Sequence, residues 1–200
     1  MSCLFCSCFV IFPVTTGEQM KQAQSRAATV WLTGLSGAGK TSIAGALAGR
    51  LKADGRAVTV LDGDLLRHGL NRDLGFTPQD RHENIRRTAE VARLMNEAGL
   101  VVIAALISPN RADRAMAAAI IGAAHFIEVH VSTPVQVCEA RDPKGLYARA
   151  RAGQIPQFTG VSAPYEAPLS PALTLDTQQQ ALEDSAGQLY RHLLAHATLL

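Results

Sequence analysis

The sequence has few aromatic residues, little net charge and no apolar run long enough to span a membrane. Of its 200 residues, 5% are aromatic, and 19 Lys and Arg against 17 Asp and Glu give a formal net charge of +2. A nearly neutral chain lacks the bulk electrostatic attraction on which non-specific binding to nucleic acid or membranes depends. We therefore expect one globular domain, no nucleic-acid or membrane partner, and anion recognition by local clusters of charge.

Cysteine is also scarce, and its distribution is unlike a disulfide framework. Cys3, Cys6 and Cys8 lie near the N-terminus, and Cys138 stands alone. This pattern favours a reducing compartment, and we expect a cytoplasmic protein. A metal site on the three N-terminal cysteines is an alternative, although no fourth ligand follows at a suitable spacing.

The N-terminal segment differs in character from the rest of the chain. Residues 4–14 are apolar enough for the core of a signal peptide, but no basic residue precedes them and they are too short to span a bilayer. We expect residues 1–27 to be a disordered or accessory extension and residues 28–200 to form the folded domain. Met20 is an alternative start of translation.

The most informative segment that is present is a phosphate-binding loop. The residues Gly34, Leu35, Ser36, Gly37, Ala38, Gly39, Lys40 and Thr41 fit the pattern G-x-x-x-x-G-K-[ST]. Glycines let backbone N–H groups turn toward an anion, Lys40 adds a positive charge, and the hydroxyl of Thr41 can ligate Mg²⁺. Together with Ser42, these residues are the predicted nucleotide-binding site.

Apolar runs and turn signals alternate along the chain. They predict strands at 29–33, 57–61, 100–107, 125–131 and 172–175, with helices between them and a last helix over 178–196. The fold class is therefore predicted to be α/β, a three-layer P-loop NTPase-type fold with a parallel sheet of about five strands flanked by helices. Residues 153–171 are rich in proline and lack periodicity, which is typical of a long loop or lid.

Charged residues gather after the second predicted strand. Asp62 and Asp64 lie at its C-terminal end, where ligands bind in open α/β sheets, although the pair could instead cap a following helix. Five arginines and two asparagines follow within about twenty positions: Arg67, Asn71, Arg72, Arg81, Asn84, Arg86 and Arg87. On a predicted helix over 80–98, Arg81 and Asn84 share one face and could jointly hold an anion, while a solvated charged face is the alternative.

These motifs resemble the adenylylsulfate (APS) kinases. The matching segments are Leu61-Asp-Gly-Asp64, Arg67-His-Gly-Leu-Asn-Arg-Asp-Leu-Gly-Phe76, Asp80-Arg-x-Glu-Asn-Ile-Arg-Arg87, Leu106-Ile-Ser-Pro109, Cys138-Glu-Ala-Arg-Asp-Pro-Lys-Gly-Leu-Tyr147, Ala150-Arg-Ala-Gly153, Phe158-Thr-Gly160 and Pro164-Tyr-Glu-Ala-Pro168. They cover roughly residues 31–177. The resemblance implies transfer of the ATP γ-phosphoryl group to the 3'-hydroxyl of APS, which gives 3'-phosphoadenylylsulfate (PAPS) and ADP in sulfate assimilation.

The resemblance also implies roles for individual residues. The catalytic set would be Lys40, Asp62, Asp64 and Ser108, with Thr41 and Asp62 on Mg²⁺, Asp64 toward the acceptor hydroxyl and Arg141 added to the ATP site. The roles of the two aspartates could be exchanged, and Ser108, a phosphoserine in some members, could instead cap the next helix. The APS contacts would be Asp64, Arg67, Phe76, Arg81, Asn84, Ile107, Ser108, Lys144 and Phe158.

The resemblance also implies an aromatic pair around the adenine, a lid and protein partners. Phe76 and Phe158 would sandwich the adenine of APS, and residues 141–171 would form a mobile lid. The resemblance suggests a homodimer, and association with an ATP sulfurylase that supplies APS is possible on the same ground. The competing interpretations are another P-loop small-molecule kinase, such as one acting on gluconate or a nucleoside monophosphate, and a non-catalytic nucleotide-binding regulatory protein.

Overall fold

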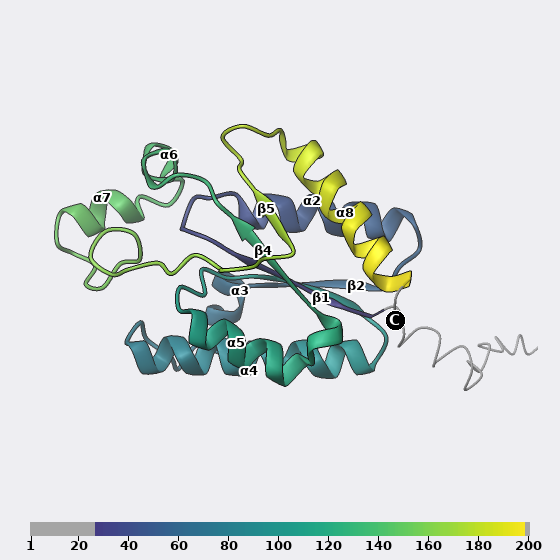
Figure 1. Ribbon diagram of the computed structural model, residues 1–200. Coiled ribbons are helices and arrows are strands. Elements are labelled where there is room, and N and C mark those ends of the chain that lie inside the picture. Colours follow the sequence, from purple (N-terminus) through teal and green to yellow (C-terminus); the bar gives the residue numbers. More distant parts are fainter. Residues whose placement is uncertain (1–26, 199–200) are drawn as a thin grey trace, which may run out of the picture.

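The computed structural model describes residues 27–198, which form a central sheet with helices on both faces (Figure 1). The five strands are β1 (Thr29–Thr33), β2 (Val58–Asp62), β3 (Val101–Ala105), β4 (Phe126–Val131) and β5 (Leu173–Leu175). All neighbouring strands pair in parallel, in the order β2-β3-β1-β4-β5. The predicted fold class, a three-layer α/β fold with a parallel five-stranded sheet, is confirmed.

The helices divide between the two faces of the sheet. They are α2 (Lys40–Ala53), α3 (Gly63–His68), α4 (Pro78–Glu97), α5 (Arg111–Ile121), the short 3-10 helix η1 (Ala123–His125), α6 (Val135–Arg141), α7 (Leu146–Arg151) and α8 (Leu182–Thr198). Helices α2 and α8 cover one face, and α4 and α5 cover the other (Figure 1). Helices α6 and α7 lie beyond one end of the sheet, together with the segment that leads to β5.

The central strand β1 supplies side chains to both hydrophobic layers. All five of its residues are buried, as expected for a strand covered on both faces. Val30 and Leu32 pack in the layer beneath α2 and α8, whereas Trp31 packs beneath α4 and α5. This alternation follows from the two-residue period of a strand, and it fixes the position of the loop that follows β1.

Two predicted elements are shorter in the structure, for identifiable reasons. The strand predicted over 100–107 ends at Ala105, because the carbonyl of Ile107 turns toward β1 and accepts hydrogen bonds from the N–H of Gly34 and the hydroxyl of Thr33. The helix predicted from residue 178 begins at Leu182. Asp176 accepts the N–H of Gln178 on its side chain, so a turn precedes the helix.

Parallel pairing places the carboxyl ends of β1, β2 and β3 at one edge of the sheet. The loop 34–39, the pair Asp62 and Asp64, and the segment 107–108 all begin there. The described chain starts at the opposite end, where the buried Ala27 accepts a hydrogen bond from His125. No helix within residues 27–198 has the length and hydropathy needed to cross a membrane. Cys3, Cys6, Cys8 and the predicted extension up to residue 26 lie outside the described residues.

Candidate active site

The backbone of the loop between β1 and α2 is held from its carbonyl side. Five consecutive carbonyl oxygens, those of residues 34–38, accept side-chain hydrogen bonds of 2.7 to 3.4 Å. The pairs are Gly34 and Leu35 with Lys40, Ser36 with Tyr147, Gly37 with Arg141, and Ala38 with Thr133 and Thr177. The N–H groups of Gly34 and Ala38 donate to the carbonyls of Ile107 and Leu35. Since the carbonyl side is occupied, the other N–H groups of the loop and the positive end of α2 are left to face an anion.

Two glycines of the loop are required by close backbone approach. A Cβ atom on Gly34 would lie 2.4 Å from the carbonyl oxygen of Val131, at the end of β4. A Cβ atom on Gly37, whose φ is 73°, would lie 2.9 Å from the carbonyl oxygen of Cys138 in α6. The loop therefore packs directly on the backbone of β4 and α6, where a larger residue would push it out of position.

Lys40 lies beneath this loop, and its Nζ donates to the carbonyls of Gly34 and Leu35 at 2.8 and 2.7 Å. Burial lowers the pKa of Lys40 from 10.5 to about 8, although the nearby Asp62 and Asp64 carboxylates oppose the shift. At neutral pH the ammonium group is thus mostly protonated, but less firmly than an exposed lysine. A bound phosphate would replace the carbonyl partners with a negative charge and so favour the protonated form.

Asp62 is held between the loop and the start of α3. Its Oδ2 accepts the hydroxyl of Thr41 at 2.7 Å, and its Oδ1 accepts the N–H of Asp64 at 2.9 Å, which makes Asp62 the N-cap of α3. The alternative that the aspartates cap a helix therefore applies to Asp62, and the same carboxylate also faces the loop. Capping fixes its orientation toward Thr41.

The Thr41 and Asp62 pair suits Mg²⁺ by its chemistry. Magnesium prefers oxygen ligands, and in nucleotide sites it needs only one or two from the protein because phosphates and waters complete the shell. Within residues 27–198, no group of three or more His, Cys, Asp or Glu side chains could hold a metal by itself. The two oxygens at 2.7 Å thus fit a cation that arrives with a nucleotide better than a permanently bound one.

Asp64 forms an ion pair with Lys144, which lies between α6 and α7. Both side chains are more than half exposed, at 61% and 51%. The structure thus joins two residues that are 80 positions apart and were both predicted for the acceptor site.

Two predicted anion-binding arginines surround Phe76. The guanidinium of Arg67 lies 4.2 Å from the centroid of the exposed Phe76 ring, and Arg81 donates to the Phe76 carbonyl at 2.9 Å. Burial lowers the pKa of both arginines, and the like charge of Arg81 adds to the effect on Arg67. Both stay charged, so they form a concentrated positive region that favours an anion between or beside them.

Arg81 also connects α4 to the segment that follows α7. It donates to the carbonyl of Gln157 at 2.8 Å and to the hydroxyl of Thr159 at 3.1 Å. Phe158 itself is 7% exposed, and its ring meets the edge of Tyr147 with centroids 5.0 Å apart. Arg81 therefore brings the Phe76 and Phe158 segments together, while the Phe158 ring packs in the hydrophobic core. The adenine sandwich stays a prediction.

Ser108 is buried at the end of β3 and has a left-handed backbone, with φ of 38°. Its hydroxyl accepts a hydrogen bond from the indole of Trp31 at 3.2 Å, and its carbonyl accepts one from Arg114 at 2.7 Å. It does not cap the next helix, because the N-cap of α5 is Asn110. Positive φ at a non-glycine residue costs energy, and such strain often marks functional positions.

Three further predicted site residues lie on α4, α2 and α6. Asn84 is buried on α4 and accepts a hydrogen bond from Asn71, and Ser42 is exposed in the first turn of α2. Arg141 lies at the end of α6, where it donates to Gly37 and Thr177.

Several side chains that hold the site together carry no recognisable motif signal of their own. Thr133 and Thr177 bond to each other and both bond to the loop, at the ends of β4 and β5. Arg114 is 2% exposed, pairs with Glu128 at 2.7 Å and bonds to the carbonyl of Glu166. Only a sheet order that sets β4 beside β1 and β5 brings these residues to the loop, so the sequence pattern alone could not find them.

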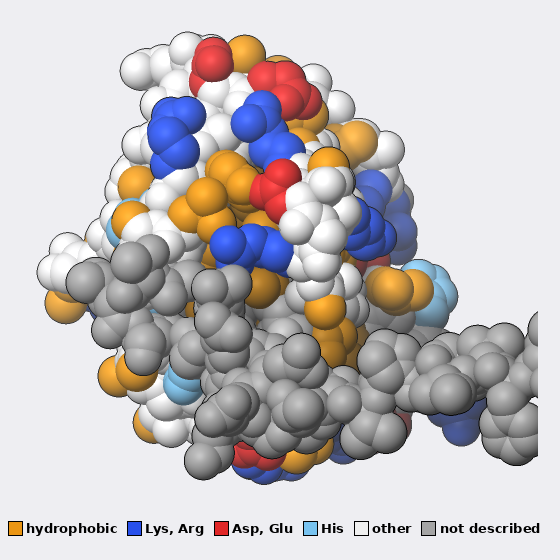
Figure 2. All heavy atoms as spheres, turned by 90° about the vertical axis from the view of Figure 1, so that its right-hand side faces the viewer, with side chains coloured by type: hydrophobic (Ala, Val, Ile, Leu, Met, Phe, Trp, Pro, Cys, Tyr) orange, Lys and Arg blue, Asp and Glu red, His pale blue; other side chains and the backbone are white. Residues whose placement is uncertain are grey.

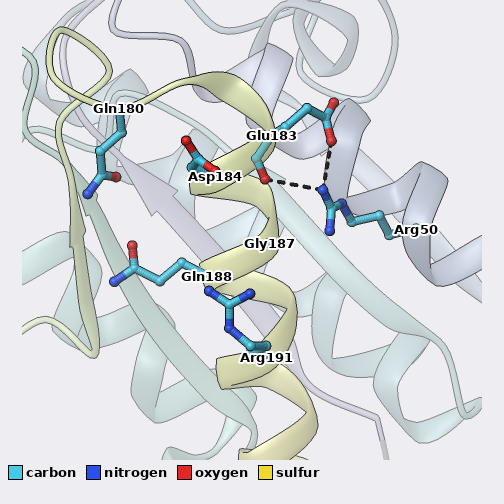
Figure 3. Close-up of a pocket in the computed structure, with 7 residues that line it drawn as sticks. All are labelled: Arg50, Gln180, Glu183, Asp184, Gly187, Gln188 and Arg191. Atoms are coloured by element: carbon cyan, nitrogen blue, oxygen red, sulfur yellow. Dashed lines mark hydrogen bonds and ion pairs between the residues drawn. The ribbon is translucent and has the colours of Figure 1, made fainter.

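Two surface hollows lie outside this region. One, of about 320 Å³, is formed by α8 and the far end of α2 and is lined by Arg50, Gln180, Glu183, Asp184, Gly187, Gln188 and Arg191 (Figure 3). Arg50 lies ten residues after Lys40, about 15 Å along the helix. The lining contains two cations and two anions, and Arg50 is already paired with Glu183 at 2.7 Å.

The other hollow, of about 480 Å³, lies between α5 and the segment 168–172. At the end of the molecule opposite the loop, side chains of both charges are interspersed with hydrophobic ones (Figure 2). Neither of these hollows combines a phosphate-binding backbone with free cations. The candidate active site is therefore the edge of the sheet where the loop 34–39 begins, which we call the loop edge.

Comparisons with known proteins extend over nearly the whole chain. Residues 26–176 match the family model of adenylylsulphate kinase. The adenylyl-sulfate kinase of Paraburkholderia xenovorans is 55% identical over 170 residues, which cover 85% of this chain and 94% of that protein. The solved structure of a Mycobacterium tuberculosis APS kinase in complex with AMPPNP and APS has 47% identity and a TM-score of 0.82, over 84% of this chain and 98% of that one.

A hexameric APS kinase from Thiobacillus denitrificans has 33% identity and a TM-score of 0.66, over 93% of this chain and 33% of that one. The match thus includes the phosphate-binding loop, Asp62 and Asp64, the arginine cluster and the segment up to β5. The chain belongs to the adenylylsulfate kinase family.

Proposed function

We propose that the protein uses the loop edge of its sheet to transfer the γ-phosphoryl group of ATP to the 3'-hydroxyl of APS, which yields PAPS and ADP. This is the reaction of the family to which the chain belongs. Two carboxylates support the division of the site into a donor side for ATP and an acceptor side for APS. Asp62 bonds to Thr41 at the start of α2, and Asp64 pairs with Lys144 in the segment between α6 and α7.

On the donor side, ATP would lie with its phosphates over residues 34–42. The loop N–H groups, the end of α2 and Lys40 would hold the phosphate oxygens, and Arg141 would lie beside the nucleotide. Thr41 and Asp62 would hold Mg²⁺, directly or through water. When bound, Mg²⁺ neutralises the negative charge that develops on the phosphates during transfer.

On the acceptor side, Asp64 would accept the proton of the 3'-hydroxyl as that oxygen attacks the γ-phosphorus. Lys144 must then move from Asp64 to the incoming anion, since a carboxylate held by a lysine is a weaker base. Arg67 and Arg81 would bind the phosphosulfate, because charge-assisted hydrogen bonds of about 1.5 to 3 kcal/mol each favour such an anion. Phe76 and Phe158 would contact the adenine, with Asn84, Ile107 and Ser108 completing the site.

Residues 141–171 would act as a lid over both substrates. Support comes from the contacts that this segment makes with each half: Tyr147 bonds to the loop carbonyl of Ser36, and the carbonyl of Gln157 accepts from Arg81. Closing the lid would exclude water, which would otherwise compete with APS for the phosphoryl group. A direct in-line transfer needs no covalent intermediate, so we assign Ser108 a positioning role through Trp31 and Arg114.

We further propose that the enzyme works in the cytoplasm as a homodimer, and that an ATP sulfurylase supplies its APS. Exposed hydrophobic side chains, among them Leu65, Leu94 and Leu169, offer surface for such contacts. Light scattering at several protein concentrations measures the oligomeric state directly, and a concentration-independent monomer would exclude the dimer.

The activity itself is tested by incubating the purified protein with Mg-ATP labelled at the γ-phosphate and with APS, then separating the nucleotides. We expect the label to appear in PAPS and to depend on both APS and Mg²⁺. Transfer of label to a different acceptor, with none to APS, would overturn the proposal.

A further inference from the structure

Two buried amides lie behind the arginines of the acceptor side. Asn71 is fully buried in the loop after α3, and Asn84 is 5% exposed on α4. The Nδ2 of Asn71 donates to the Oδ1 of Asn84 at 3.0 Å. Backbone bonds fix Asn71 on both sides, because its N–H donates to the carbonyl of Leu66 and its carbonyl accepts from Leu74.

This bond decides which way the amide of Asn84 faces. A carboxamide has an acceptor oxygen on one side and a donor NH₂ group on the other. Since the oxygen of Asn84 is turned toward Asn71, its Nδ2 is turned away from Asn71. Rotating either amide alone by half a turn would bring two oxygens or two NH₂ groups together, so the two orientations are coupled.

The side-chain amide of Asn71 makes a hydrogen bond through its NH₂ group and none through its oxygen. Its Oδ1 is the one buried side-chain oxygen or nitrogen, among the residues that the structure describes, without a hydrogen-bond partner. Burying an unsatisfied acceptor costs free energy, and a leucine of similar size would avoid that cost. An asparagine at this position therefore contributes something that packing alone does not require.

We propose that Asn71 is a positioning residue that fixes the amide of Asn84, so that Asn84 presents its NH₂ group to an acceptor atom of APS. The acceptor would be an oxygen or a ring nitrogen, and a group that only donates would be rejected at this position. This role of Asn71 rests on the proposed function, in which Asn84 contacts APS.

The test compares leucine substitutions at three buried asparagines. Asn71→Leu removes the donor to Asn84, and we expect the KM for APS to rise roughly three- to tenfold while the KM for ATP stays unchanged. Asn84→Leu removes the contact itself and should raise the KM for APS at least as much. Asn96→Leu is the matched control, because Asn96 is also buried on α4 but bonds to Thr29 and Leu100. It should lower the melting temperature and leave the KM for APS unchanged.

A second variant keeps the test informative if Asn71→Leu does not fold. In Asn71→Asp, the protonated carboxyl group can donate to Asn84 and the carboxylate cannot. The KM for APS of this variant should therefore rise with pH by a larger factor than that of the wild type.

The outcomes separate the inference from the proposed function. If Asn84→Leu raises the KM for APS but Asn71→Leu and Asn71→Asp match the wild type at every pH, the positioning role is wrong. If Asn84→Leu itself leaves the KM for APS unchanged, the assignment of Asn84 to the acceptor site fails first, and the inference falls with it.

Discussion

The donor and acceptor halves of this site are built in opposite ways. The proposed donor half is built mainly from one continuous segment, residues 34–42, whose shape depends on backbone geometry and on side chains that bind its carbonyls from behind. The proposed acceptor half is assembled from side chains of three segments: Asp64, Arg67 and Phe76 in and after α3, Arg81 and Asn84 on α4, and Lys144 and Phe158 on either side of α7. Backbone recognition gives a site for any phosphate chain, whereas side chains from distant segments can select one acceptor.

The two halves also differ in exposure and in the state of their charges. Lys40 is buried and bonded to its own loop, while Asp64 and Lys144 are more than half exposed and paired with each other. In the donor half Lys40 would exchange carbonyl partners of its own loop for phosphate, whereas in the acceptor half an ion pair between two segments would have to open. Substitutions in the two halves should therefore have separable kinetic effects.

The largest effect should come from Asp64→Asn. Loss of a general base typically costs about 10² to 10⁴ in rate, so kcat should fall by that factor while the dissociation constant for Mg-ATP stays the same. Single-turnover kinetics together with calorimetric ATP binding measure the two quantities. Asp184→Asn, on the far side in α8, is the matched control and should behave as the wild type. Turnover of the Asp64 variant at the wild-type rate would remove Asp64 from the mechanism.

Arg81→Ala should come next and should affect only the acceptor half. Its guanidinium joins the Phe76 and Phe158 segments and would bind the anion, so its loss should raise the KM for APS about ten- to a hundredfold. The KM for ATP should stay within about twofold of the wild type. Arg86→Ala, on the same helix but paired with Glu83, serves as control. Equal increases in both Michaelis constants would show that Arg81 supports the whole fold instead.

The pH dependence of kcat/KM for ATP should report the charge of Lys40, which belongs to the donor half. Its pKa of about 8 lies below the ordinary 10.5, so the free enzyme loses the ammonium charge as the pH rises through 8. The kcat/KM for ATP should fall about tenfold per pH unit above that value, since this ratio reports on the free enzyme. Lys40→Arg should give a lower but flat profile, because arginine stays charged. A wild-type profile that stays flat to pH 10 would contradict the low pKa.

The smallest effect should be that of Tyr147→Phe, at the point where the halves meet. The variant keeps the ring that packs on Phe158 but removes the hydroxyl that donates to Ser36 at 3.0 Å. One lost hydrogen bond of about 0.5 to 1.5 kcal/mol should raise the KM for ATP roughly two- to tenfold. Steady-state kinetics should show an unchanged KM for APS. An increase for APS alone would mean that the hydroxyl orders the lid rather than the loop.

The same contrast explains what could be predicted from the sequence. The alternation of strands and helices and the loop at residues 34–41 are local patterns, and residue spacing alone predicts both. The pairing of Asp64 with Lys144 and the bond from Asn71 to Asn84 depend on packing between segments, which no local pattern records. The resemblance to a family supplied names for the acceptor residues, but not the supporting contacts of Thr133, Thr177 and Arg114.

The chain contains a single tryptophan, Trp31, and its position makes it an optical reporter of the site. The indole is fully buried in β1, lies against Phe126 with centroids 5.7 Å apart, and donates to the hydroxyl of Ser108. All tryptophan fluorescence of the protein therefore comes from one position, one hydrogen bond away from the end of β3 where APS would bind. We therefore expect the emission of the unlabelled enzyme to change when APS binds, which would allow binding to be followed in real time.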